Sequence, residues 1–178
     1  MKAFFRTAVA AAALAMAGTL SAQAEQIKVG FSPEAYPPFY SQDASGNWGG
    51  WEVEIAMAIC ADQKLDCVLT PIPWDGLIPA LKSKKINTIM NSMSITEERQ
   101  KEIDFSDKYY QTPPSVAVPK DSPIDNVDPA TFKGKTIGAQ SSTIHANYAE
   151  EVFADAGASV KLYPTQDEAN ADLASGRL

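Results

Sequence analysis

The segment at 91–99 carries the residue types best suited to holding a small anionic group. It reads Asn-Ser-Met-Ser-Ile-Thr-Glu-Glu-Arg and follows a short β-branched run that predicts a strand. Ser94 and Glu97 form a capping-box pattern, and Thr96 is a second candidate for the N-cap of a helix. Free backbone N–H groups at such a helix start attract an anion, and Arg99 adds a planar charged fork that suits a carboxylate. An ordinary capped helix with a solvated arginine fits the same segment, so the surrounding elements decide between the two.

The first 24 residues have the pattern of a secretory signal peptide. Lys2 and Arg6 make a basic start, 8–20 is an apolar stretch too short to span a bilayer, and 22–24 is a small-residue cleavage signal. We therefore expect an exported mature chain that begins at Glu25. It carries no lipid anchor in this interpretation, because no cysteine lies at the cleavage point.

The charge balance argues against two classes of partner. The chain has a formal net charge of −7, and loss of the signal peptide removes two of its basic residues and no acidic one. A chain this acidic is repelled by nucleic acid and by anionic lipid.

Cys60 and Cys67 are the only cysteines, and they lie seven residues apart. In a compartment that permits oxidation they have a single possible pairing, so we predict a disulfide, which stabilises the fold by roughly 2–3 kcal/mol on the chain-entropy model. Two buried thiols are the less favoured alternative after export. A metal site is less favoured still, because His145 is the only histidine, and nothing in the sequence calls for a cofactor.

Strand and helix patterns alternate through the first half of the chain. The elements expected are strands at 27–31, 67–70 and 86–90, helices beginning at Trp51 and Trp74, and a turn-rich hairpin at 43–50. Trp51, Ile55 and Ile59 have helical spacing, and Glu52 and Glu54 in the first turn suit the helix dipole. The order β-α-β-α-β predicts a largely parallel sheet, in which ligands bind beyond the carboxyl ends of the strands.

Two aromatic residues are expected at that edge of the sheet. Tyr36 lies on a loop stiffened by Pro37 and Pro38, and Trp74 lies at a strand-to-helix junction. Each is well placed to cover a ligand, although packing in the core is the ordinary fate of such residues.

The second half repeats the alternation after a proline-rich crossing at 111–118. A strand ends in the small polar residues of 140–143, a helix follows at 144–156, and another strand and helix occupy 160–163 and 166–175. Two polar helix starts are thus expected to face each other across a cleft. His145 is interpreted as a solvated helix residue. The chain stops at Leu178, where the next strand is expected, which is the pattern of a fragment.

Taken together, these motifs resemble one family closely. They are Tyr36-Pro37-Pro38-Phe39, Gly50-Trp51-Glu52, Cys60 to Cys67, 74–81, 92–99, Phe105-Ser106, Lys133-Gly134-Lys135 and Ser175-Gly176-Arg177. The set resembles the periplasmic amino-acid-binding proteins of ABC importers, which are the family-3 solute-binding proteins and include the lysine/arginine/ornithine and histidine binders.

The resemblance implies a two-lobe α/β fold of the type II periplasmic binding proteins, closing on one amino acid. It divides the chain into a signal peptide at 1–24, lobe 1 at 25–112 and a partial lobe 2 at 113–178, without the return to lobe 1. It also implies a monomer that delivers a polar L-amino acid to a permease and its ATPase at the inner membrane, and that is not an enzyme.

The resemblance assigns roles to individual residues. Arg99 would clamp the ligand carboxylate with help from Ser94, Ser92 would bind the amino group beside Asn91, and Tyr36 and Trp74 would sandwich the side chain. The residues expected to line the cleft from lobe 2 are Gln140, Ser142, Thr143 and Ile144. The spacing of Cys60 and Cys67 also matches the disulfide of the family.

The sequence departs from the family at two places. Ser32 stands where binders of cationic amino acids carry an aspartate, with Glu34 as the nearest acid, so a polar or neutral ligand is open. The acid that pairs with the ligand ammonium is expected beyond Leu178. An exported dehydratase on the same scaffold is the main alternative, with Glu34 or His145 as its acid–base group. A sensing module of a larger receptor is a third hypothesis.

Overall fold

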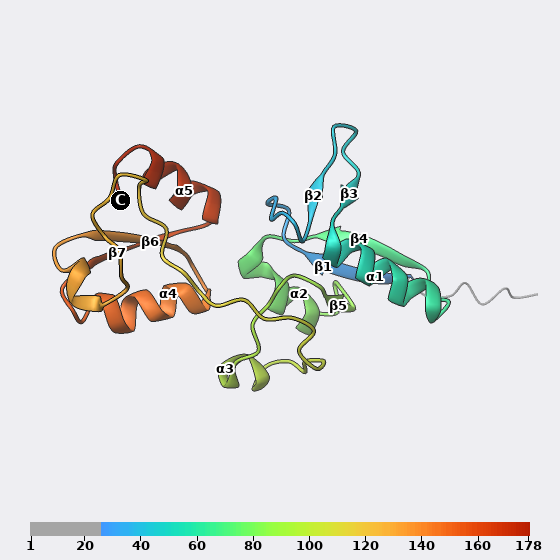
Figure 1. The fold of residues 1–178 in the computed structure, drawn as a ribbon. Coiled ribbons are helices and arrows are strands. Elements are labelled where there is room, and N and C mark those ends of the chain that lie inside the picture. Colours follow the sequence, from blue (N-terminus) through green and yellow to red (C-terminus); the bar gives the residue numbers. More distant parts are fainter. Residues whose placement is uncertain (1–25) are drawn as a thin grey trace, which may run out of the picture.

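The computed structural model describes residues 26–178, so the predicted signal peptide lies outside the described residues. Two bodies follow one another along the chain, each built on its own parallel sheet (Figure 1). We call the body with the three-stranded sheet lobe 1 and the body with the two-stranded sheet lobe 2. The division of the chain at 112 and 113 stays a prediction. Within the described part of the chain, no helix is long and apolar enough to cross a membrane.

Lobe 1 has the predicted β-α-β-α-β order. Strand β1 lies in the centre and pairs in parallel with β4 and β5, giving the order β4-β1-β5. The expected hairpin is also present as an antiparallel pair, β2 and β3. The bounds are β1 Ile27–Phe31, β2 Ser41–Gln42, β3 Trp48–Gly49, α1 Trp51–Asp62, β4 Cys67–Pro71, a 3-10 turn Trp74–Gly76 leading into α2 Leu77–Lys82, β5 Thr88–Ile89 and α3 Glu97–Gln100.

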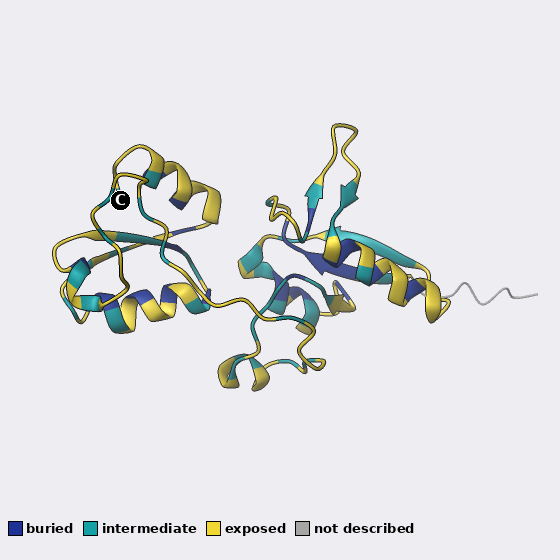
Figure 2. Cartoon of the chain, in the orientation of Figure 1, coloured by how far each residue is buried: buried dark blue, intermediate teal, exposed yellow. Residues whose placement is uncertain are grey.

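Helix α1 packs on the sheet with a different face from the one whose side-chain spacing predicted the helix. Trp51 and Ile59 are 38% and 54% exposed, whereas Val53, Ala56 and Cys60 are buried against β1 and β4. In Figure 2, α1 lies along the sheet of lobe 1 and has buried and exposed residues on different sides. The small side chains on this face let the helix approach the sheet closely, so they form the core contact while the larger ones stay outside.

The predicted disulfide is confirmed. Cys60 and Cys67 are joined with an S–S distance of 2.06 Å, which ties the last part of α1 to the first residue of β4. The bond thereby fixes which side of the helix lies on the sheet.

Lobe 2 repeats the strand-helix pattern on a smaller scale. Its strands β6 and β7 pair in parallel, and α4 continues without a break into a π-helical segment. Phe132, Ala149 and Phe153 form the centre of its core. The bounds are a 3-10 turn Pro129–Phe132, β6 Thr136–Gln140, α4 Ile144–Tyr148, the π-helical segment Ala149–Phe153, β7 Ser159–Tyr163 and α5 Gln166–Ala174.

The segment at 101–128, which links the lobes, contains no helix or strand. Its first part belongs to lobe 1, where the rings of Tyr109 and Tyr110 pack on Trp51. Its later part belongs to lobe 2, where Val116 and Ile124 pack on the core. The chain therefore crosses between the lobes after Tyr110 and before Val116.

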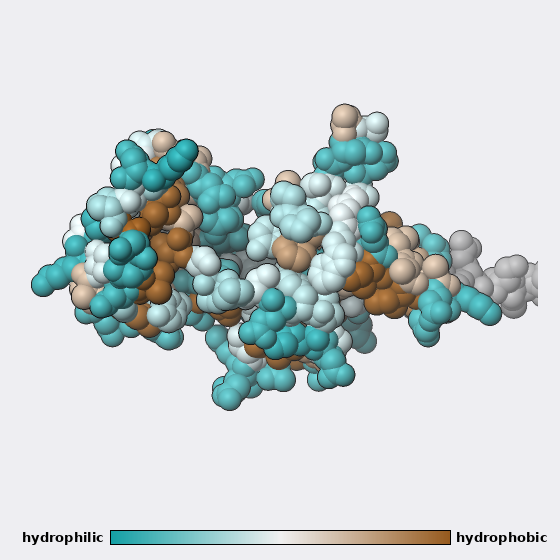
Figure 3. All heavy atoms as spheres, viewed as in Figure 1, coloured by the Kyte–Doolittle hydropathy of each residue, from teal (hydrophilic) through white to brown (hydrophobic). Residues whose placement is uncertain are grey.

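Apolar residues also reach the surface of both lobes. Met57, Ile59 and Leu65 are 40%, 54% and 45% exposed around the end of α1, and Leu162 of β7 is 40% exposed in lobe 2. Figure 3 shows hydrophobic residues gathered at both places, with hydrophilic residues over most of the remaining visible face.

Candidate ligand-binding site

Helix α3 begins at Glu97, and its N-cap is Thr96. The Thr96 side chain accepts a hydrogen bond from the backbone N–H of Arg99 at 3.2 Å. The predicted capping box at Ser94 is therefore wrong, because the helix starts too late for the Ser94 side chain to cap it. With only four residues, α3 is too short to offer an anion site at its N-terminus, so the chemistry of this segment rests on Arg99.

Arg99 joins the two lobes through its guanidinium group. Its Nη1 donates to the backbone carbonyl of Ser94 at 2.9 Å, and its Nη2 donates to the backbone carbonyl of Ser142 in lobe 2 at 3.0 Å. Partial burial lowers the pKa of Arg99, although the group stays charged because its usual pKa is far above neutral. A charged guanidinium group thus lies at the boundary between the lobes.

Trp74 forms one wall beside this guanidinium group. The guanidinium carbon of Arg99 lies 5.4 Å from the centre of the Trp74 ring, which is cation–π geometry. The indole Nε1–H donates to the same Ser142 carbonyl at 3.2 Å. Ser142 has a φ of 58°, in the left-handed region that few residues other than glycine adopt. One carbonyl of lobe 2 therefore accepts hydrogen bonds from two side chains of lobe 1.

A pocket of about 60 Å³ opens where these residues meet. Its volume equals that of a few water molecules. Asp75 also belongs to the lining, and its Oδ2 accepts a hydrogen bond of 3.4 Å from the Ser141 hydroxyl of lobe 2. The residues that line the pocket are Trp74, Asp75, Ile78, Met93, Arg99 and Ser142. The lining therefore combines an aromatic ring, one positively charged side chain and one negatively charged side chain.

Asn91 and Ser92 lie at the carboxyl end of β5 but turn toward the interior of lobe 1. Asn91 is buried, and its Oδ1 accepts the backbone N–H of Ser32 at 2.6 Å. Ser92 has a φ of 50°, and its backbone N–H donates to Glu52 at 2.8 Å. The Ser92 hydroxyl is buried and has no hydrogen-bond partner among the described residues. Neither residue lines the pocket beside Arg99.

Tyr36 belongs to an aromatic cluster and is not among the residues that line the pocket with Trp74. It is 45% exposed and stacks on Phe39, with ring centroids 5.2 Å apart. Phe39 continues this aromatic cluster to Trp51 and Tyr110. The sandwich of a ligand side chain between Tyr36 and Trp74 stays a prediction.

The predicted residues of lobe 2 support the loop that carries Ser142. Thr143 is the N-cap of α4, accepting the N–H of Ala146 at 3.1 Å and donating to the carbonyl of Gln140 at 2.7 Å. The Gln140 side chain donates to the carbonyl of Pro164 at 3.2 Å, and Ile144 is the first residue of α4. Of these residues only Ser142 lines the pocket, and the cleft roles of the others stay predictions.

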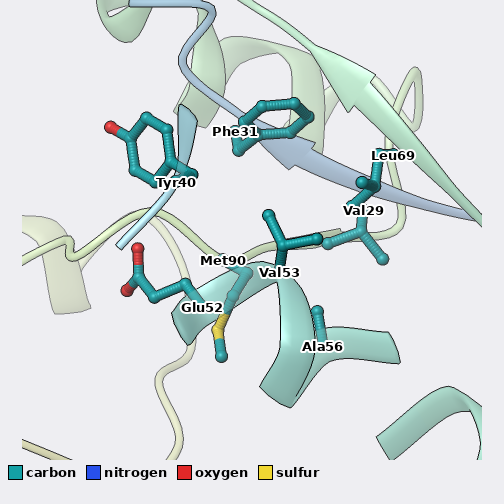
Figure 4. Close-up of a pocket in the computed structure, with 8 residues that line it drawn as sticks. All are labelled: Val29, Phe31, Tyr40, Glu52, Val53, Ala56, Leu69 and Met90. Atoms are coloured by element: carbon teal, nitrogen blue, oxygen red, sulfur yellow. The ribbon is translucent and has the colours of Figure 1, made fainter. Parts of the chain in front are cut away.

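Sequence reasoning missed Glu52 as a residue of structural interest. Its place in the first turn of α1 was explained by the helix dipole, yet it is 1% exposed. Figure 4 shows its carboxylate turned away from Val53 and Ala56, on the wall of a cavity of about 10 Å³ in the core of lobe 1. The signal in the sequence was its position directly before Val53, which has helical spacing with Ala56 and Cys60.

Proteins of known function align with most of this chain. It is 41% identical over 145 residues to the L-arginine-binding protein of Pseudomonas aeruginosa, covering 81% of this chain and 55% of that protein. It is 38% identical over 154 residues to the histidine-binding periplasmic protein of Salmonella typhimurium, covering 86% and 58%. It is 37% identical over 163 residues to the lysine/arginine/ornithine-binding periplasmic protein of Escherichia coli, covering 91% and 62%. The chain thus spans little more than half the length of these relatives.

Solved structures give the same picture of the fold. An ancestral arginine-binding protein bound to arginine superposes with a TM-score of 0.79 at 34% identity, covering 86% of this chain and 67% of that one. An ancestral amino-acid-binding protein that is a precursor of cyclohexadienyl dehydratase superposes with a TM-score of 0.78 at 29% identity, covering 85% and 67%. Residues 27–173 match the sequence pattern of one family. The chain belongs to the bacterial extracellular solute-binding proteins, family 3.

Proposed function

We propose that this chain binds a polar L-amino acid between its two lobes in the periplasm and delivers it to an ABC permease and its ATPase at the inner membrane. The observation that carries the proposal is the meeting of Arg99 and Trp74 of lobe 1 with the Ser142 carbonyl of lobe 2. A ligand held by these residues contacts both lobes at once, which is what coupling of binding to lobe closure requires.

The donors of Arg99 suit the carboxylate of an amino acid. A guanidinium group has five N–H donors, of which the carbonyls of Ser94 and Ser142 use one on each terminal nitrogen. One N–H on each of these nitrogens remains for the two oxygens of a carboxylate. Each such bond contributes about 1.5–3 kcal/mol, whereas micromolar capture needs about 8 kcal/mol. Further contacts and lobe closure must supply the rest, which is the role proposed for Tyr36, Ser92 and the loop at 140–144.

The presence of Ser32 is consistent with a polar amino-acid ligand whose side chain carries no positive charge. Ser32 is buried, and its hydroxyl donates to the carboxylate of Glu34 two residues later. The acid expected for a cationic ligand is therefore replaced by a hydroxyl that already has a partner. The relatives named for arginine, histidine and lysine/arginine/ornithine binding give the range of ligands to test first.

An enzyme on the same scaffold is the second candidate, because one structural relative is a precursor of a dehydratase. Turnover would need a general acid or base in the cleft. Glu34 is hydrogen-bonded to Ser32, and His145 is exposed in the first turn of α4, outside the lining of the pocket. We therefore propose binding without turnover.

A thermal-shift screen of the mature protein against the common L-amino acids tests both candidates. A ligand at a hundred times its dissociation constant stabilises the native state by about 2.7 kcal/mol, which gives a clear shift in melting temperature. We expect one class of polar amino acid to produce the shift and to be recovered unchanged from the protein. A screen without any shift, or recovery of a dehydrated product, would contradict the binding proposal.

A further inference from the structure

Glu52 is a buried acid outside the pocket that contacts two distant parts of the chain. Its Oε1 accepts the backbone N–H of Ser92 at 2.8 Å and also accepts the hydroxyl of Tyr109. Its Oε2 is buried and accepts no hydrogen bond from the described residues. These contacts join residues 40 and 57 positions apart in sequence. One carboxylate thus links α1, the segment at 91–99 and the segment that crosses to lobe 2.

Stability alone does not account for a carboxylate at this place. Within residues 26–178 it has no basic partner, since the ion pairs there join Lys82 to Glu102 and both Lys161 and Arg177 to Asp172. Burying a charge without a cation is costly, and among the described residues only the hydrogen bonds from Ser92 and Tyr109 compensate the Glu52 carboxylate. The benefit of the carboxylate must then come from what it holds in place.

Both groups held by Glu52 need a fixed partner. Ser92 is in the left-handed conformation, which costs a residue other than glycine about 1 kcal/mol or more and persists only where the surrounding structure holds it. Burial and the bond to Glu52 raise the pKa of Tyr109 well above its usual value, so its hydroxyl remains a donor. Trp51, the neighbour of Glu52, adds ring contacts to Tyr109 and Tyr110 at 5.7 and 5.3 Å. The first turn of α1 therefore contacts Tyr109 and Tyr110, the last residues before the chain crosses to lobe 2.

We propose that Glu52 is a positioning residue for ligand binding, which holds on one carboxylate the Ser92 backbone and Tyr109, a residue of lobe 1 just before the chain crosses to lobe 2. The segment at 91–99 and the connection between the lobes then move as one unit. Glu52 acts only through these two residues, because it is too deeply buried to touch a ligand. The inference rests on the proposed function, since it takes the segment at 91–99 as part of the ligand site.

Three substitutions in the mature protein separate this role from a general effect on stability. Glu52→Gln keeps the shape and the acceptor but removes the charge, which makes its hydrogen bonds roughly half as strong. Tyr109→Phe removes one donor and keeps the ring that packs on Trp51. Asp172→Asn is the matched control, because Asp172 is a buried acid of lobe 2 that likewise accepts a tyrosine hydroxyl, from Tyr163 at 2.5 Å.

Hydrogen exchange tests the linkage without any ligand. We expect Tyr109→Phe to speed exchange of the Ser92 amide by at least about threefold, although Tyr109 does not contact that amide in the structure. The reason is that the Glu52 carboxylate, which accepts the Ser92 N–H, loses its hydrogen bond from the Tyr109 hydroxyl. Asp172→Asn should leave this amide unchanged. An unchanged Ser92 amide in Tyr109→Phe would overturn the inference.

Titration with the amino acid found in the screen tests the effect on binding. We expect Glu52→Gln to weaken binding about tenfold, Tyr109→Phe to weaken it less, and the double variant to match Glu52→Gln, because Tyr109 acts through Glu52. Asp172→Asn should lower the urea midpoint and leave the dissociation constant within about twofold. Unchanged binding by Glu52→Gln, or full additivity in the double variant, would refute the positioning role. If the wild type binds no amino acid, the proposed function fails, and hydrogen exchange alone decides about Glu52.

Discussion

Replacing Arg99 with alanine is the most direct perturbation of the proposed site. The substitution removes the guanidinium group that stands between the Ser94 carbonyl in lobe 1 and the Ser142 carbonyl in lobe 2. It also removes the cation that lies 5.4 Å from the centre of the Trp74 ring. We therefore expect the substitution to affect both the proposed ligand binding and the contact between the lobes.

The size of the effect follows from the donors that Arg99 has left. Two of its five N–H groups are used within the protein, and one on each terminal nitrogen is free for a carboxylate. Two charge-assisted bonds of about 1.5–3 kcal/mol each give a loss of about 3–6 kcal/mol. At 1.4 kcal/mol for each factor of ten, binding by Arg99→Ala should be about 10²–10⁴ times weaker than in the wild type.

Isothermal titration of the mature protein with its amino acid measures this loss. Arg99→Lys should fall between the wild type and Arg99→Ala, because lysine keeps the charge and loses the fork. Arg177→Ala is the matched control, because this arginine pairs with Asp172 in lobe 2 and its side chain is 61% exposed. It should leave the dissociation constant within about twofold of the wild type. Binding by Arg99→Ala within threefold of the wild type would refute the assignment of the carboxylate to Arg99.

Four further predictions concern other elements. Trp74→Ala removes the ring beside Arg99 and the donor to the Ser142 carbonyl, and should weaken binding in the same titration by about 10–100-fold. Replacing Cys60 and Cys67 together with serine should lower the free energy of unfolding by about 2.5 kcal/mol in urea, and equal stability would contradict the chain-entropy argument. Thr96→Ala should cost about 1 kcal/mol in the same assay while Thr96→Ser costs less, because only alanine removes the N-cap oxygen. Hydrogen bonds from Arg177, Lys161 and Tyr163 hold the pKa of Asp172 below its usual range, so its contribution to stability is present above about pH 4 and is lost as the pH falls below that value. The difference in urea midpoint between the wild type and Asp172→Asn should accordingly shrink on acidification.

The parts of the fold that could be predicted are those in which a local pattern and the topology agree. The alternation of strands and helices gave the parallel sheet of lobe 1, and the rule that ligands bind beyond the carboxyl ends of strands brought Trp74 and the segment at 91–99 to one edge. The disulfide followed from the count of cysteines, because Cys60 and Cys67 have a single pairing.

The parts that could not be predicted are those in which two sequence patterns fit the same element equally well, so that only the tertiary structure selects one of them. Helix α1 has two stripes with helical spacing, Trp51, Ile55 and Ile59 on one side and Val53, Ala56 and Cys60 on the other. Periodicity identifies the helix in both cases, and only packing on the sheet selects the buried side. Likewise Ser94 and Thr96 both fit an N-cap, and the observed start of α3 decides between them.

Glu52 was missed for the same reason, since an acid in a first helical turn is explained equally well by a solvated dipole contact. Its burial becomes visible only when the backbone of Ser92 and the hydroxyl of Tyr109 arrive from distant parts of the chain. Sequence patterns report local periodicity, whereas this site is defined by contacts over 40 and 57 residues.

In the proposed function, the arrangement around Ser142 makes ligand capture and lobe contact parts of one equilibrium. A carbonyl has two lone pairs, and here Arg99 and Trp74 each donate to the same oxygen. A ligand shifts the arrangement of two lobes only by as much as it prefers one arrangement over the other. Arg99 reaches Ser142 with one N–H of its Nη2 and still has N–H groups for a carboxylate, so we expect the proposed ligand to favour the arrangement in which the guanidinium bridges the lobes. The residue proposed to recognise the carboxylate is thereby also the residue through which recognition is expected to favour closure.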